Sequence, residues 1–276
     1  MNRFSLNQAT IKKADLATAL RVTAEAGIPA IGLWREPVQE VGLARAADLV
    51  RGSGLRVSSL CRGGFFTTPE RPERRAALDD NRRALDEAEA LGAPTLVLVV
   101  GGLPAGSTDL VGARSRVADA LAELAPDATA RGVQLSIEPL HPMYAADRAV
   151  VSTLGQALDL AAPFEPAAVG VVVDTFHVWW DPELAAQVAR AGREGRIASY
   201  QVCDWVTPIA PDALLSRGIP GDGHIDFTAV TALLRDAGYT GDVECEVFRQ
   251  EVWDADPAEV ARRCAAAYRE FVEPVL

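Results

Sequence analysis

The feature that most constrains the fold is a repeated alternation of short apolar runs with longer amphipathic segments. The apolar runs are rich in β-branched residues, which is typical of buried parallel strands, and each is followed by helical spacing of apolar residues. The expected strands are residues 4–7, 30–34, 55–61, 95–100, 133–138, 169–174, 197–203 and 242–248. The expected helices are residues 14–27, 41–52, 70–91, 110–131, 153–162, 182–191, one that begins near 226, and 257–272.

This alternation predicts an α/β fold, a (β/α)8 TIM barrel in which residues 1–276 form a single domain. Strand–helix units follow one another without a linker-like break, and barrels of this kind reach this length as one domain. A doubly wound open sheet is the alternative. It more often has a glycine-rich phosphate loop after its first strand, and the residues after Leu6 contain none. No Walker sequence or Gly-x-Gly-x-x-Gly precedes a helix, so nucleotide cofactors are not expected.

Composition and charge argue against several classes of partner. The chain has 27 Lys plus Arg against 38 Asp plus Glu, a net charge of −11, so we expect no nucleic acid partner. The first residues show no apolar core behind a basic start, and no apolar run is long enough to span a membrane. We therefore expect a cytoplasmic protein with no membrane partner. The 4 cysteines lack Cys-x-x-Cys spacing, and three lie in strand-like runs as expected core residues.

Unusual side chains gather where the expected strands end. All 3 histidines and all 5 tryptophans follow a strand, and no expected helix carries a tryptophan. Because active sites of this fold lie at the carboxyl ends of the strands, this distribution predicts an apolar-walled pocket with a few polar groups. For any single tryptophan, the alternative is that it only closes the top of the barrel. The side chains expected to contact substrate here are Trp34, Arg62, His141, Trp179 and Trp205.

Four side chains at these strand ends have the chemistry of a divalent-metal site. Glu138, Asp174, Gln201 and Glu246 provide three carboxylates and one amide oxygen, hard ligands that suit Mg²⁺ or Mn²⁺. Each has a structural alternative: a helix N-cap for Asp174, a satisfied buried amide for Gln201, and an arginine partner for either glutamate. Glu244 faces the same side of the last strand as Glu246, and we choose Glu246 because it lies nearer the carboxyl end.

Several longer segments resemble the sugar phosphate isomerase/epimerase group of xylose isomerase-like TIM barrels. They are Ser-Ile-Glu-Pro at 136–139, Val-Asp-Thr-Phe-His at 173–177, Pro-Gly-Asp-Gly-His-Ile-Asp-Phe at 220–227, and Gly-Tyr-Thr-Gly-Asp-Val-Glu-Cys-Glu at 238–246. The resemblance covers nearly the whole chain. This superfamily includes ketose 3-epimerases, hydroxypyruvate isomerase, inosose dehydratase and endonuclease IV. The resemblance implies that Glu138, Asp174 and Glu246 hold one divalent metal. The family usually has histidine where this chain has Gln201.

The resemblance further implies a metal-dependent isomerase or epimerase of carbohydrate metabolism with a small-molecule sugar substrate. Mn²⁺ or Mg²⁺ would bind two oxygens of a ketose or related α-hydroxyketone and stabilise an enediolate. Glu138 and Glu246 would then act as the acid/base pair. His177 and Arg217 would hold substrate hydroxyls, although Arg217 could equally be a solvated loop residue.

Two other functions stay open at this point. The first is a metal-dependent lyase or dehydratase that acts on a keto-sugar or keto-cyclitol. The second is a non-catalytic sugar-binding barrel or complex subunit, which the glutamine at position 201 keeps open. Phosphate-ester cleavage as in endonuclease IV requires a histidine-rich three-metal site and a basic face, which 3 histidines and a net charge of −11 do not provide. Barrels of this kind often pair, so a homodimer is kept open. The sequence selects neither the sugar nor its phosphorylation state.

Overall fold

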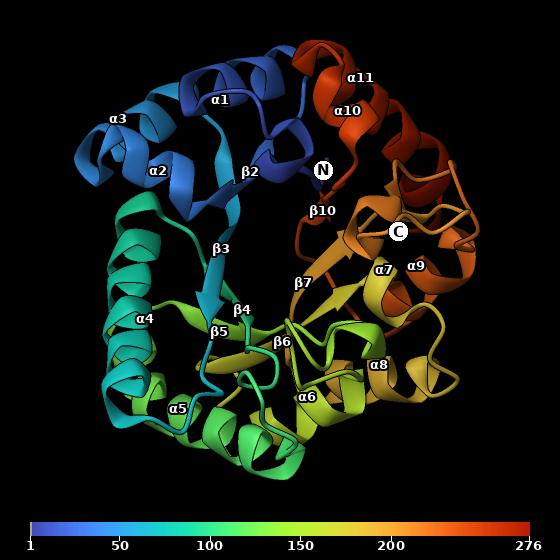
Figure 1. Cartoon of the computed structure of the whole chain (residues 1–276). Coiled ribbons are helices and arrows are strands. Elements are labelled where there is room, and N and C mark those ends of the chain that lie inside the picture. Colours follow the sequence, from blue (N-terminus) through green and yellow to red (C-terminus); the bar gives the residue numbers. More distant parts are fainter. Residues whose placement is uncertain (1) are drawn as a thin grey trace.

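A computed structural model of residues 2–276 shows a closed parallel barrel with an outer ring of helices (Figure 1). In this part of the chain the barrel strands follow the order β1-β10-β7-β6-β5-β4-β3-β2, so the first and last strands pair and close the barrel. The barrel strands are β1 Phe4–Asn7, β2 Ala30–Trp34, β3 Arg56–Gly64, β4 Thr95–Val99, β5 Gln134–Ile137, β6 Val169–Asp174, β7 Ile197–Val202 and β10 Val243–Cys245. The predicted TIM barrel is confirmed and the open sheet is excluded. The exact domain bounds of 1–276 stay a prediction.

The helices cover the outside of the barrel and begin largely where the sequence places capping residues. Asp226 was expected as an N-cap, and its side chain accepts the backbone N–H of Ala229 at 2.9 Å. The helices are α1 Leu16–Glu25, α2 Arg35–Val41, α3 Leu43–Ser53, α4 Arg71–Leu91, α5 Leu110–Arg131, α6 Leu154–Ala161, α7 Thr175–Val178, α8 Leu184–Arg193, α9 Phe227–Asp236, α10 Gln250–Asp254 and α11 Pro257–Ala267. Within residues 2–276, no helix has the length and apolar character needed to cross a membrane.

The structure corrects the expected end of the third strand. We expected this strand to end at residue 61, but β3 continues to Gly64 and pairs there with β4 after an irregularity at Cys61. Asn81 of α4 also holds this end of the strand, because its amide both accepts the N–H of Gly64 and donates to its carbonyl oxygen. A Cβ at Gly64 would lie 1.8 Å from the carbonyl oxygen of Val99, so only glycine permits this close approach.

Several short elements at the carboxyl end of the barrel were not expected, among them α7, which carries His177. Helix α2 follows β2 directly, ahead of the expected helix, which begins at Leu43 as α3. The loop after β7 contains a two-stranded hairpin, β8 Asp204–Trp205 with β9 Arg217–Gly218. Trp253 lies in α10, so the expectation that no helix carries a tryptophan is wrong.

Side chains alternate along β6 between two environments. Val171 and Val173 face the main core between the strands and the helices, whereas Val172 belongs to a small apolar cluster inside the barrel with Cys61 and Val97. Asp174 is two residues beyond Val172 and therefore points inward at the carboxyl end. The inner face of the barrel therefore carries a small apolar cluster together with polar residues.

Candidate active site

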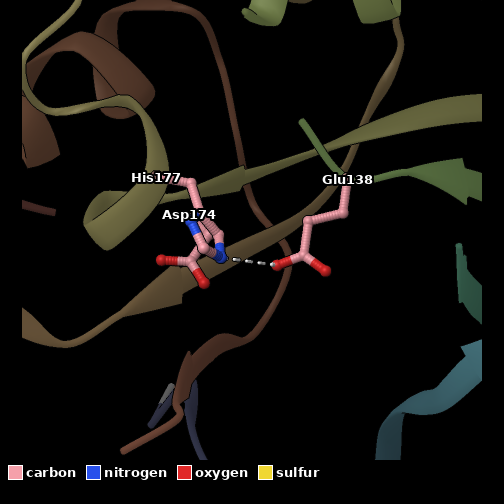
Figure 2. Close-up of side chains that lie close together, drawn as sticks. All are labelled: Glu138, Asp174 and His177. Carbon is pink, nitrogen blue, oxygen red and sulfur yellow. Dashed lines mark ion pairs between the residues drawn. The ribbon is translucent and has the colours of Figure 1, made fainter. Parts of the chain in front are cut away.

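Three buried ligand groups converge at the carboxyl ends of β5 and β6 (Figure 2). Glu138 follows β5, Asp174 ends β6, and His177 lies in the short helix α7. One ligand atom from each residue lies within 4.8 Å of the others, and Glu138 Oε1 is 3.9 Å from His177 Nε2. Each side chain is at least nine-tenths buried. The structure therefore brings together two residues of the expected metal set and one expected to contact substrate.

Asp174 both caps a helix and faces the other residues of the site. Its Oδ1 accepts the backbone N–H of Phe176 at 2.8 Å and so caps α7, as the structural alternative required. Its Oδ2 points to a different partner, the guanidinium of Arg217, at 2.9 Å. The cap uses one oxygen and fixes the carboxylate, which leaves the second oxygen for the site.

Arg217 lies at the centre of the site, not in solvent. Its Nη1 donates to Asp174 Oδ2 at 2.9 Å and to Glu246 Oε2 at 3.1 Å. The guanidinium carbon lies 4.9 Å from the ring centroid of Phe176 and 5.2 Å from that of Phe248. The residue is 1% exposed, so the alternative of a solvated loop residue is wrong. Two acids and two aromatic rings hold this cation in one place.

Asp204 explains why the loop that carries Arg217 has a fixed shape. Its Oδ2 accepts the backbone N–H groups of Gly221 and Gly223 at 2.9 and 2.8 Å, and its Oδ1 accepts that of Ile225 at 3.0 Å. These donors belong to the Pro-Gly-Asp-Gly-His-Ile-Asp-Phe segment at 220–227. Asp204 was not among the residues expected from the sequence, although an acid directly after a strand and ahead of a glycine-rich loop was the available signal.

The site has a surplus of negative charge. Ionised Glu138, Asp174 and Glu246 carry three negative charges, and in residues 2–276 Arg217 is the one Lys or Arg in ion-pair contact with any of them. Burial and the neighbouring Asp174 and Glu246 raise the pKa of Glu138 well above its ordinary value. Burial likewise raises the pKa of Glu246 to about 8, although Arg217 opposes this shift. A further cation would stabilise the ionised forms of these acids.

His177 receives two N–H groups on a ring that accepts only one when neutral. The backbone N–H of His141 points at Nδ1 at 3.2 Å, and Arg217 Nη2 lies 2.9 Å from Nε2. Burial, with help from Arg217, lowers the pKa of His177 well below its ordinary value, so the ring is neutral at physiological pH. One of the two contacts is therefore unfavourable. A hydroxyl placed between Arg217 and His177 would relieve it.

Gln201 and Glu244 form a second, deeper group inside the barrel. Gln201 is paired in register with Asp174 on one side and with Glu244 on the other. Its Nε2 lies 3.2 Å from Glu244 Oε1, whereas its Oε1 is buried without a hydrogen-bond partner among the described residues. The expected alternative of a fully satisfied amide is therefore wrong. Glu246 lies one residue beyond the end of β10 and faces Arg217 instead.

Aromatic side chains line opposite parts of the barrel mouth. On one side the ring of Trp34 packs edge-on against Phe248, at a centroid distance of 5.6 Å. Arg62 covers Trp34 at 5.8 Å and remains 41% exposed, with Glu36 as an ion-pair partner at 3.7 Å. On the other side lies a cluster around Trp205, which contacts the rings of His141, Phe176 and Trp179. The residues expected to contact substrate thus surround the acids in two groups.

A solved structure from a bacterium is similar over nearly the whole chain. The protein SMc04130 of Sinorhizobium meliloti 1021 is 47% identical, with a TM-score of 0.95, and the match covers 98% of each chain. The likeness therefore extends over the whole barrel.

Two named relatives match over part of the chain. An inosose isomerase of Bacillus licheniformis is 29% identical over 158 residues, which are 56% of this chain and 54% of that protein. A 3-dehydroshikimate dehydratase of Pseudomonas aeruginosa is 30% identical over 179 residues, 62% of this chain and 26% of that protein. The matched part of this chain thus spans about half of the first relative and a quarter of the second.

A family model matches most of the barrel. The family described as xylose isomerase-like TIM barrel matches residues 20–270, which include every acid of the site. The barrel fold and the acids at the carboxyl ends of its strands are consistent with this match. The chain belongs to the xylose isomerase-like TIM barrel family.

Proposed function

We propose that this chain is a divalent-metal-dependent sugar isomerase or epimerase that acts on a ketose or related α-hydroxyketone. The observation that carries the proposal is the presence of three buried carboxylates at the carboxyl end of the barrel, two of which share the single cation Arg217 and the third of which lies beside Asp174 and His177. The inosose isomerase and 3-dehydroshikimate dehydratase relatives support an activity of this class.

The residues fit a hard divalent cation. With Arg217 counted, ionised Glu138, Asp174 and Glu246 leave two negative charges uncompensated, which a divalent metal would balance. The unpartnered Oε1 of Gln201 adds a neutral oxygen ligand on the same inner face. Oxygen ligands of this kind suit Mn²⁺ or Mg²⁺. We therefore propose that Glu138, Asp174, Gln201 and Glu246 hold the metal, which would polarise a substrate carbonyl and stabilise an enediolate.

Glu138 and Glu246 are the proposed acid/base pair. They follow strands β5 and β10, which are separated in the barrel by β6 and β7, so they approach the mouth from different sides. Burial raises the pKa of each carboxyl in the metal-free chain, so neither is held in its ionised form by the surrounding protein alone. One group would remove the proton next to the carbonyl, and the other would return a proton. Return to the opposite face of the same carbon gives epimerisation, and return to the neighbouring carbon gives aldose–ketose isomerisation.

Unused hydrogen-bonding groups near the mouth would hold the sugar hydroxyls. The phenol oxygen of Tyr144, Nε of Arg217 and Nε1 of Trp179 are buried without a hydrogen-bond partner among the described residues. Tyr144 packs edge-on against His177 at 5.7 Å, which places it beside the acids. A polyhydroxylated ligand would satisfy these groups, together with the competing contacts at His177. Trp34, Arg62, His141 and Trp205 complete the proposed substrate contacts.

A lyase that acts on a keto-sugar or keto-cyclitol is the second candidate. The same first step, removal of a proton next to a carbonyl, leads to dehydration when a β-hydroxyl leaves. The 30% identity to a dehydratase over 62% of this chain favours this candidate. The two candidates therefore share the site and the deprotonation step, and they differ in the fate of the deprotonated sugar.

Solvent deuterium exchange tests the proposal. Purified protein in D₂O with Mn²⁺, Mg²⁺ or Zn²⁺ is offered a panel of ketoses, hydroxypyruvate, inosose and keto-glycosides, and the proton next to each carbonyl is followed by NMR. We expect exchange that disappears when EDTA removes the metal. The product then separates isomerase, epimerase and lyase.

Controls make the negative outcome informative. Calorimetry measures whether each metal and each sugar binds under the same conditions. Sugar binding without exchange on any panel member would contradict the enzyme and favour the non-catalytic sugar-binding barrel. Exchange that survives EDTA would contradict the metal. A cytoplasmic location and a homodimer stay predictions.

A further inference from the structure

Glu244 is a fully buried acid that the proposed chemistry does not use. It lies on β10 two residues before Glu246, and among residues 2–276 it has no Lys, Arg or His partner. Neutral donors surround it instead: Asn7 Nδ2 at 2.6 Å, Ser58 Oγ at 2.5 Å, Ser59 Oγ at 2.8 Å and Gln201 Nε2 at 3.2 Å. Four hydrogen bonds from neutral donors therefore hold this buried carboxylate in place.

The direction of each hydrogen bond in this group follows from groups that can only donate. Asn7 Oδ1 lies 2.9 Å from the backbone nitrogen of Ala9 and 2.9 Å from the indole nitrogen of Trp34. Both nitrogens carry a hydrogen and have no free lone pair, so the oxygen of Asn7 must face them. The amide nitrogen of Asn7 therefore faces Glu244 Oε1, which acts as an acceptor.

The amide of Gln201 is oriented in the same way. Its terminal group lies 3.2 Å from Glu244 Oε1, the oxygen that already accepts from Asn7. Because this oxygen acts as an acceptor toward Asn7, Gln201 turns its NH2 group toward it. The amide oxygen then points away from Glu244, and it has no partner among the described residues. A glutamine without such an anchor could present either its oxygen or its NH2 group to a metal.

A glycine in the barrel wall makes room for the carboxylate of Glu244. A Cβ at Gly32 would lie 2.5 Å from the carboxyl carbon of Glu244 and 2.5 Å from Oε1, so the glycine in β2 admits the carboxylate. The register pairs Glu244 with both Ser5 and Gln201. The hydrogen-bonded chain therefore runs from Trp34 at the mouth, through Asn7 and Glu244, to Gln201 beside Asp174.

We propose that Glu244 is a positioning residue that turns the amide oxygen of Gln201 toward the metal site and so makes glutamine a dependable ligand where the family usually has histidine. The inference rests on the proposed function, because it assumes that Gln201 binds the metal. Partners that orient metal ligands typically contribute about 10- to 100-fold to metal affinity.

Calorimetric titration of Mn²⁺ into metal-free protein tests the inference without measuring activity. Glu244→Met removes the acceptor with little change in side-chain length, and we expect Mn²⁺ affinity to fall about 10- to 100-fold. Glu244→Gln is the conservative variant. Its carbonyl oxygen can still accept from Asn7 and Gln201, while Ser58 and Ser59 can turn to accept from its NH2, so Mn²⁺ affinity should return to within about threefold of the parent.

Two combinations with Gln201 separate positioning from general damage. If Glu244 acts through Gln201, the pair Gln201→Ala and Glu244→Met should bind Mn²⁺ no more weakly than Gln201→Ala alone. Glu244→Met with Gln201→Glu should recover affinity, because a carboxylate presents an oxygen in either orientation. Additive losses in the first pair, or no recovery in the second, would contradict the inference.

The single variants also test the positioning role of Glu244 and the ligand role of Gln201 separately. If Gln201→Ala weakens Mn²⁺ binding and Glu244→Met does not, the positioning role is wrong and the ligand set stands. If Glu138→Ala abolishes binding and Gln201→Ala has no effect, Gln201 is not a ligand and that part of the proposed function fails. Should Glu244→Met not fold, NMR of the parent chain replaces it. The Gln201 NH2 protons should exchange slowly with solvent before and after Mg²⁺ is added, and fast exchange would contradict the inference.

Discussion

Glu244 and Glu246 lie two residues apart on one side of the last barrel strand, yet their surroundings differ. Glu244 is surrounded by neutral donors that partly offset the rise in its pKa caused by burial. Burial raises the pKa of Glu246 to about 8; the ion pair with Arg217 opposes this rise, and the nearby Asp174 and Glu244 add to it. The first environment satisfies a fixed carboxylate. The second leaves a carboxylate that can gain or lose a proton near neutral pH.

This difference shows how one strand provides both a reactive acid and its support. A step of two residues keeps the same inner face but moves the side chain toward the barrel mouth. At the deeper level, side chains from β1, β3 and β7 meet across the interior and can saturate an acid. At the mouth, α7 and the β8–β9 hairpin provide a histidine and an arginine instead.

The largest effect should come from removing the proton-transfer group at the mouth. Glu246→Gln preserves size but cannot exchange a proton, so we expect turnover at saturating metal and sugar to fall about 10²- to 10⁴-fold. The measurement is kcat on whichever panel sugar undergoes exchange. A variant with near-parental kcat would remove Glu246 from the acid/base pair.

Arg217 distinguishes Glu246 from Glu244, because it contacts Asp174 and Glu246 but not Glu244. Arg217→Met leaves Asp174 and Glu246 without their cation, so we expect Mn²⁺ affinity to rise about tenfold. Sugar affinity should fall, because the groups that face His177 and the substrate are lost. Calorimetry with metal and then with sugar measures both. A loss of Mn²⁺ affinity would instead indicate that Arg217 mainly holds the acids in position.

The pH dependence of stability should separate the two acids. Because folding raises the pKa of Glu246 from 4.5 to about 8, its contribution to stability is present below its unfolded pKa and is lost as pH rises through the folded value. The melting temperature of metal-free protein should therefore fall by several degrees between about pH 5 and pH 9.

Two comparisons check that the fall of the melting temperature with rising pH comes from Glu246 at the barrel mouth. Glu246→Gln should flatten it, and saturating Mn²⁺ should remove the contribution of Glu246 because the metal stabilises the ionised carboxylate. A slope that is unchanged in Glu246→Gln and in the presence of Mn²⁺ would assign the effect to another group.

The smallest effect should come from Asp204, which supports the mouth from outside the site. Asp204→Asn replaces one acceptor oxygen by an NH2 group that faces backbone donors, so we expect a loss of about 1–3 kcal/mol in the free energy of unfolding. KM for the sugar should rise because the loop of Arg217 loosens, while Mn²⁺ affinity stays close to the parent. Equal losses in both affinities would place Asp204 closer to the metal site than the structure indicates.

The barrel strands and the acids near their carboxyl ends could be predicted from the sequence, but the exact end of β3 and the contacts across the barrel could not. The run at 169–174 is apolar on both faces, so its buried strand and terminal acid follow from local pattern. Asn7 and Glu244 are 237 residues apart, and only barrel closure brings them within 2.6 Å. The position of Arg217 depends on a hairpin with no periodic signal.

Solvent deuterium exchange as a function of Mn²⁺ concentration, in Glu244→Met beside Glu246→Gln, tests the central claim most directly. If Glu244 only positions a ligand, exchange in Glu244→Met should recover toward the parental rate as Mn²⁺ saturates the weakened site. If Glu246 transfers the proton, the Glu246→Gln exchange rate should stay low at every Mn²⁺ concentration. Recovery in Glu246→Gln, or a rate in Glu244→Met that stays low at saturating Mn²⁺, would contradict the division of roles between these two acids.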